Sequence, residues 1–84
     1  MLSESDFDTF DTIRRYREVI RTGRYLELRK IFGLSQAQVA EAIGVGKPSI
    51  SHYESGRRIP TGETALRYGR FMDELERRLA ETDS

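Results

Sequence analysis

Apolar residues recur at spacings of three and four along almost the whole chain, and this helical period constrains the fold more than any other feature. No stretch alternates apolar and polar residues with an enrichment in β-branched types, so no strand is predicted. Glycines and Pro60 interrupt the pattern and divide it into five expected helices, over about residues 6–21, 24–32, 36–42, 48–54 and 62–80. The sequence therefore predicts an all-α protein.

Cap residues support these boundaries. Ser5 is the expected N-cap of the first helix, because Asp6 and Asp8 then fall in the first turn, where the helix dipole favours negative charge. Gly23 is suited to the left-handed conformation that ends a helix. Ser35 and Thr61 are the expected caps of the third and the last helix.

Size and composition limit what such a helical chain can be. With 84 residues it forms one small domain, and such a domain buries only roughly 60–65% of its unfolded surface. It contains no cysteine and one histidine, so we expect neither a disulfide nor a metal or other cofactor. Oligomerisation is then the remaining source of buried area.

The distribution of charge is more informative than the net charge of zero. Residues 14–58 carry ten basic and four acidic residues, whereas residues 1–13 carry four acidic and no basic ones. A basic segment favours an anionic partner such as nucleic acid. No apolar run approaches the about 20 residues of a membrane span, and the acidic start does not resemble a signal peptide. We expect a cytoplasmic protein that does not associate with a membrane.

The most specific pattern lies between residues 35 and 56, where two short helices are joined by a tight turn that contains glycine. This is the helix-turn-helix arrangement. Ala40 is small where the two helices cross, and Gly44 stands where the turn needs a positive φ. Pro48 is tolerated because the first turn of a helix needs no amide donor. Three apolar residues are expected to fix the angle between the helices: Val39, Val45 and Ile50.

This segment resembles the Xre family, the phage-repressor and Cro type of helix-turn-helix protein. The residues that carry the resemblance are Arg29, Ser35-Gln36, Ala40, Gly44-Val45, Ile50-Ser51, Glu54-Ser55-Gly56 and Pro60. The resemblance covers about residues 24–72 without gaps and implies a compact helical bundle of the lambda-repressor type. Two regions depart from it, so we expect an added N-terminal amphipathic helix (1–22), a DNA-binding domain (23–72), and an extension of the last helix with a frayed tail (73–84).

The resemblance also implies which residues meet DNA. Helix 48–54 would lie in the major groove with its first residues at base edges. Lys47 suits guanine O6 and N7, Ser51 suits several bases, and Pro48 offers apolar contact to a thymine methyl. Gln36 would bond a backbone phosphate, and Arg29 would form a structural ion pair with Glu54. The full set of expected DNA contacts is Gln36, Lys47, Pro48, Ser49, Ser51, His52, Arg57 and Arg58.

For Lys47, His52, Arg57 and Arg58 the alternative is an ordinary solvated surface group. That alternative is the preferred interpretation for the arginines of the first helix, Arg14, Arg15, Arg17 and Arg21. Gly46 stands where the family usually has Ser or Thr, so the recognition helix is expected to lack a side-chain cap.

Apolar stripes also lie outside the family's domain. Burying a large apolar side chain gains about 1.5–3 kcal/mol, so we expect these stripes to be covered. One arrangement is a homodimer whose interface includes Phe7, Phe10, Leu75 and Leu79; the other folds the first helix over the last within one chain.

The function expected from these features is a sequence-specific DNA-binding transcriptional regulator, a repressor that binds an inverted-repeat operator on double-stranded DNA as a dimer. The alternative is a protein-interaction module, antitoxin-like or a partner-binding scaffold, built on the same domain. No serine–histidine–acid set, phosphate loop or metal-ligand spacing is present, so we expect neither an enzyme nor a small-molecule ligand.

Overall fold

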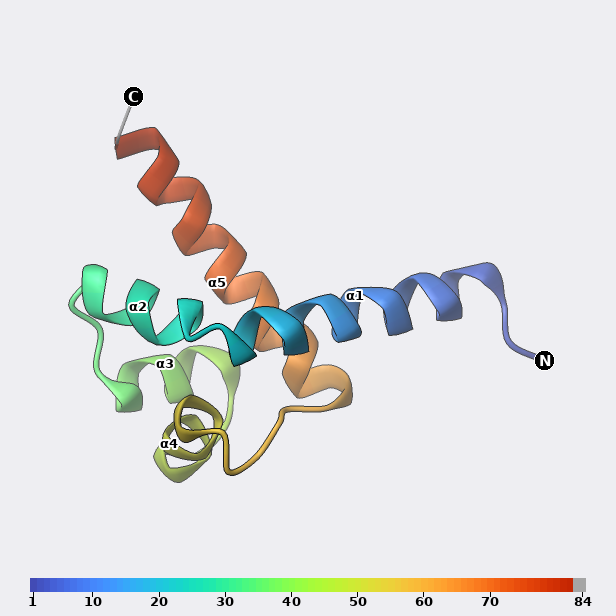
Figure 1. Cartoon of the computed structure of the whole chain (residues 1–84), viewed down its shortest axis with the longest axis horizontal. Helices are drawn as coiled ribbons and strands as arrows, with labels where there is room; N and C mark the ends of the chain where they lie inside the picture. Colours follow the sequence, from blue (N-terminus) through green and yellow to red (C-terminus); the bar gives the residue numbers. More distant parts are fainter. Residues whose placement is uncertain (83–84) are drawn as a thin grey trace.

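The computed structural model describes residues 1–82, which form five helices and no strand (Figure 1). The predicted all-α helical bundle is confirmed. Helix α5 runs two residues further than predicted, and the part of the expected frayed tail that follows it, residues 83–84, lies outside the described residues. The helices are α1 (Glu4–Arg21), α2 (Arg24–Ile31), α3 (Gln36–Ile43), α4 (Lys47–Ser55) and α5 (Gly62–Thr82).

The start of α1 differs from the prediction, because Ser3 and not Ser5 is its N-cap. The Ser3 side chain accepts a hydrogen bond from the Asp6 amide at 3.3 Å, and the Asp6 carboxylate accepts one from the Ser3 amide at 2.9 Å. This capping box satisfies two amides at once. The helix begins at the earlier box because each residue added to an existing helix gains a backbone hydrogen bond. The hydrogen bonds from Ser3 also lower the pKa of Asp6.

Helix α1 crosses α5 at a glycine. The ring of Tyr16 lies so close to Gly69 that a Cβ atom at that position would come within 2.2 Å of it. The Tyr16 hydroxyl donates a hydrogen bond of 2.9 Å to Asp73, one turn further along α5. Past this crossing the first half of α1 extends away from the other helices, with the N-terminus at its tip (Figure 1).

The core lies between α5 and the three short helices α2, α3 and α4. Tyr68 stands near its centre, with the rings of Tyr25 and Tyr53 at centroid distances of 5.1 and 5.6 Å. The buried members of this core are Tyr25, Leu28, Val39, Ala40, Ile43, Ile50, Tyr68, Met72 and Leu75.

The expectation that Leu75 and Leu79 lie beyond the core is wrong. Leu75 is only 7% exposed and belongs to the core, and Leu79 packs against it. The reason is that α2 lies along this part of α5, where the Arg24 guanidinium hydrogen-bonds Glu76. The stripe on α5 is thus covered within one chain. The second half of α1 is covered in the same way, because Val19 and Ile20 pack against the core.

Within residues 1–82, no helix combines the length and the apolar character that crossing a membrane requires.

Candidate nucleic-acid interface

The turn between α3 and α4 has the geometry that the sequence predicts. Gly44 adopts the left-handed conformation with φ of 76°, which a side chain would strain. The amide of Val45 donates to the Ala40 carbonyl at 3.0 Å and closes the turn. Val39 and Ile50 are fully buried on either side of it, and Val45 is half-buried. These contacts fix the direction of α4 relative to α3.

The first turn of α4 presents polar groups outward. Gly46 is the N-cap and makes no side-chain cap hydrogen bond, and Pro48 occupies the first turn. Lys47, Pro48 and Ser51 are exposed. The turn therefore offers a cation, a hydroxyl and an apolar ring at one end of a helix, which are groups that can meet base edges.

Two further residues that we expect to contact bases are less exposed than Lys47, Pro48 and Ser51. Ser49 and His52 are half-buried. The His52 Nδ1 atom is shielded and has no hydrogen-bond partner among the described residues. This leaves Nε2 as the ring nitrogen that can meet a base or a phosphate.

A partly buried polar network supports α4 from behind. Arg29 and Glu54 form the expected pair with two parallel hydrogen bonds, Nε to Oε2 at 2.6 Å and Nη2 to Oε1 at 2.9 Å. Their side chains are only 13% and 7% exposed. Arg29 also donates to the carbonyl of Leu34 at 3.0 Å, which holds the connection between α2 and α3. The hydrogen bond to Glu54 raises the pKa of Arg29, so the guanidinium stays charged.

Gln36 joins this network, which the sequence reasoning missed. Its Nε2 atom donates to Glu54 Oε1 at 2.9 Å and ties the first turn of α3 to the last turn of α4. A side-chain amide has two hydrogens, so one remains for the phosphate contact expected of this residue. In the sequence, the only indication of this hydrogen bond is that Gln36 and Glu54 both belong to the residues that resemble the Xre family.

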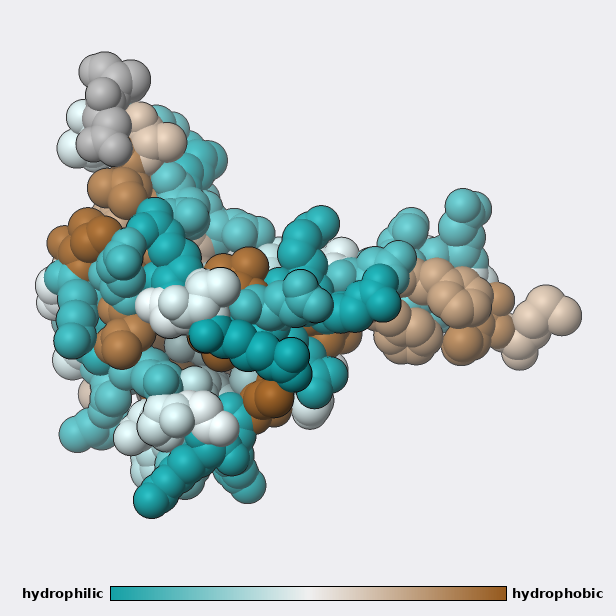
Figure 2. All heavy atoms as spheres, in the orientation of Figure 1, coloured by the Kyte–Doolittle hydropathy of each residue, from teal (hydrophilic) through white to brown (hydrophobic). Residues whose placement is uncertain are grey.

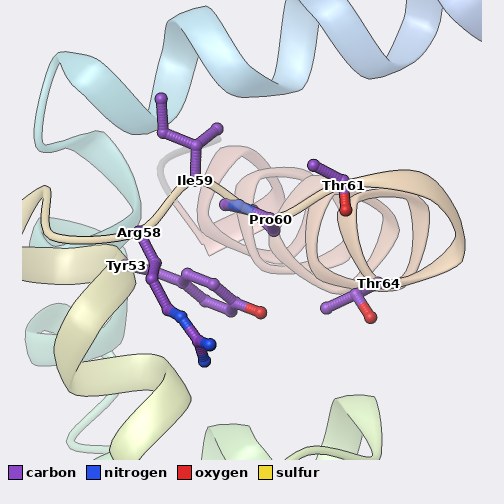
Figure 3. Close-up of a pocket in the computed structure, with 6 residues that line it drawn as sticks. All are labelled: Tyr53, Arg58, Ile59, Pro60, Thr61 and Thr64. Carbon is purple, nitrogen blue, oxygen red and sulfur yellow. The ribbon is translucent and has the colours of Figure 1, made fainter.

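The segment after α4 carries the two remaining expected contacts, Arg57 and Arg58. Both side chains are exposed, and neither forms an ion pair within residues 1–82. The Arg58 amide donates to the His52 carbonyl at 3.2 Å, so the segment turns back against α4. Arg58 borders a hollow of about 280 Å³, together with Tyr53 and the hydroxyls of Thr61 and Thr64 at the start of α5 (Figure 3). A guanidinium group beside hydroxyls can donate hydrogen bonds to a phosphate.

The residues expected at a dimer interface separate into two groups. Leu75 and Leu79 pack within the chain, as described above. Phe7 and Phe10 remain 55% and 51% exposed and contact each other edge to face, with centroids 6.3 Å apart. They form an apolar patch on the extended part of α1 (Figure 2).

No group of three or more metal-ligating side chains occurs in the part of the chain that the structure describes.

Comparison with known proteins agrees with the geometry of α3 and α4. A family model described as Helix-turn-helix matches residues 26–76, more than half of the chain. The match begins within α2 and ends within α5, so α1 lies outside it. Comparisons with curated proteins and with solved structures gave no match. The chain belongs to the helix-turn-helix family of Xre, Cro and lambda-repressor-like proteins, a family of DNA-binding regulators rather than of enzymes.

Proposed function

We propose that the protein is a sequence-specific DNA-binding regulator that represses transcription by occupying an operator. One observation carries this proposal. The polar first turn of α4 is exposed, while the opposite side of the same helix is held by the partly buried Arg29–Glu54–Gln36 network. A rigid helix with an open polar end is what reading a major groove requires.

The proposed contacts divide into two kinds. Lys47, Pro48, Ser49, Ser51 and His52 would meet base edges, since they stand on the first turns of α4. Gln36, Arg57 and Arg58 would meet backbone phosphates, which position the protein without specifying sequence. Function in contact with DNA places the protein in the cytoplasm, and the mechanism requires no cofactor.

The exposed half of α1 supports a dimer. One recognition helix reads only a half-site, whereas a two-fold dimer reads two half-sites about 34 Å apart. We propose that a second copy of the chain covers Phe7 and Phe10, because two large apolar side chains held together in solvent are costly to leave uncovered. The operator would then be an inverted repeat.

A Lys47→Ala variant tests the proposal. Selection from a random duplex pool first gives the bound sequence. Loss of one base contact should weaken binding to it by about 1–3 kcal/mol, with unchanged thermal stability because Lys47 is exposed. Lys30→Ala is the matched control, since Lys30 is also exposed, forms no ion pair within residues 1–82 and ends α2 away from the α4 first turn. Equal binding of the wild-type protein to selected and scrambled duplexes would contradict sequence-specific reading. A footprint of one asymmetric half-site at saturation would contradict the dimer.

A protein-interaction module is the second candidate, and the exposed Phe7–Phe10 pair is the observation that favours it. The two candidates differ in their response to salt. DNA binding that neutralises phosphates weakens steeply as salt rises, whereas an apolar protein contact does not. A regulator that binds no duplex in 50 mM salt but captures a protein through α1 would support the second candidate.

A further inference from the structure

The second half of α1 borders a hollow of about 220 Å³ that is lined almost wholly by cations. Its lining residues are Arg14, Arg17, Glu18 and Arg21. The Nε atom of Arg17 is shielded from solvent and has no hydrogen-bond partner among the described residues. A shielded guanidinium donor without an acceptor is unusual in a folded protein. Arg17 therefore keeps an unused donor in a hollow with three guanidinium groups and one carboxylate, that of Glu18.

The three arginines share one face of α1. Their spacing of three and four residues places them above one another on the helix. From Arg14 to Arg21 the helix rises about 10 Å. Successive phosphates of one DNA strand advance about 3.4 Å along the duplex axis. The row thus matches the axial length of about three phosphate-to-phosphate steps along one strand.

This row continues to the end of the recognition helix. A second hollow, of about 300 Å³, lies between the end of α1 and the end of α4. Arg21 and Gly23 line it on one side, and Gly56 and Arg58 on the other. Arg21 borders both hollows, so it lines the same hollow as Arg58, together with the Glu54 carboxylate.

The arginines of this row form fewer ion pairs than the arginines at the end of α5. Arg14 pairs only with its exposed neighbour Asp11, at 3.0 Å, and within residues 1–82 Arg17 and Arg21 form no ion pair. On the second half of α5, by contrast, Arg77 and Arg78 both pair with Glu74. The chain therefore neutralises its arginines at the far end of α5 and leaves them available beside α4.

We propose that Arg14, Arg17 and Arg21 form a phosphate-binding face that contacts the DNA backbone next to the half-site read by α4. The inference rests on the proposed DNA binding and extends the interface onto a helix outside the family match. The acidic first half of α1 from a second copy would be another anionic partner. DNA is favoured because the row joins Arg58, which lies directly after the recognition helix.

The test is the Arg17→Gln, Arg21→Gln double variant, binding a fluorescent 30-base-pair duplex of mixed sequence at 50 to 200 mM KCl. Each phosphate contact contributes about 0.9 to the slope of log K against log salt. Loss of two contacts should make this slope shallower by about 1.8, roughly twice the contribution of a single contact. Circular dichroism should show the same helix content and unfolding temperature as for the wild type, because neither Arg17 nor Arg21 belongs to the apolar core or forms an ion pair within residues 1–82.

The matched control is Arg77→Gln, Arg78→Gln, which removes the same charge from the second half of α5 and should leave the slope unchanged. An equal change of slope in both variants would mean that overall charge acts at long range, and would overturn the inference. An unchanged slope in the α1 variant would also overturn it. A loss of self-association in sedimentation with an unchanged slope would assign the face to a second copy instead. If the wild-type protein bound no duplex at all, the proposed function itself would fall.

Discussion

The first half of α1 and the second half of α5 have a similar apolar pattern and opposite surroundings. Both are amphipathic helical segments rich in charge, and both carry apolar residues at spacings of three and four. On α5 these side chains are covered: Leu75 lies in the core and Leu79 packs against it. On α1 they are open, as the apolar patch of Phe7 and Phe10 shows (Figure 2). An apolar stripe in the sequence therefore does not reveal whether another helix of the same chain covers it.

The two segments differ in exposure because the other helices pack against α5 and not against the first half of α1. Helix α2 lies along α5 and holds it through Arg24 and Glu76. Helix α1 instead meets α5 at one crossing, where Gly69 lets the ring of Tyr16 approach the backbone. Short helices are marginal without such packing. The open half of α1 therefore depends on its capping box for stabilisation within the chain.

The largest expected effect separates the two segments by stability. Leu75→Ala should lower the free energy of unfolding by about 2–5 kcal/mol, because it leaves a cavity in the core. Phe10→Ala should change it by less than about 0.5 kcal/mol, because its side chain is exposed. Urea unfolding at a concentration too low for self-association measures both. Equal losses in the two variants would show that α1 is packed as α5 is.

A smaller effect is expected at the crossing itself. A methyl group at Gly69 would overlap the Tyr16 ring, and overpacking of this kind costs about 1–3 kcal/mol. The gain in helix propensity from Gly to Ala, up to about 1 kcal/mol, does not offset this. Gly69→Ala should therefore speed amide exchange in α1 while the amides of α3 and α4 keep their protection. Arg70→Ala is the control, because Arg70 is the neighbouring residue and is exposed. A Gly69→Ala protein that was more stable than the wild type would show that α1 and α5 do not depend on this contact.

Much of the DNA-facing domain could be predicted because its signals are local. The turn at Gly44, the cap at Ser35 and the missing cap at Gly46 each follow from residues within a few positions of one another. The Arg29–Glu54 ion pair could be predicted only from the family resemblance, since 25 residues separate the two partners in the sequence.

Features set by long-range packing could not be predicted in this way. The Gln36 contact to Glu54, the burial of Leu75 and the close approach at Gly69 depend on how helices distant in sequence meet. The hollow beside α1 is a similar case. In the sequence its arginines resemble an ordinary solvated helix face, whereas the structure shows that Arg21 lines the same hollow as Arg58.

The smallest expected effect concerns the charged side chains at the end of α5. Glu74 on α5 accepts hydrogen bonds from Arg77 and Arg78, which lower its pKa from 4.5 to about 2. A carboxyl group whose pKa is lowered by folding stabilises the native state above its unfolded pKa, and this contribution is lost as pH falls through the folded pKa. Glu74→Gln should therefore lower the unfolding temperature slightly at pH 7, by an amount that shrinks below pH 4.5 and vanishes near pH 2. Because the Glu74 side chain is accessible to solvent, 0.5 M salt should reduce the difference at pH 7 as well. A difference that persisted at pH 2 would show that Glu74 acts through packing and not through its charge.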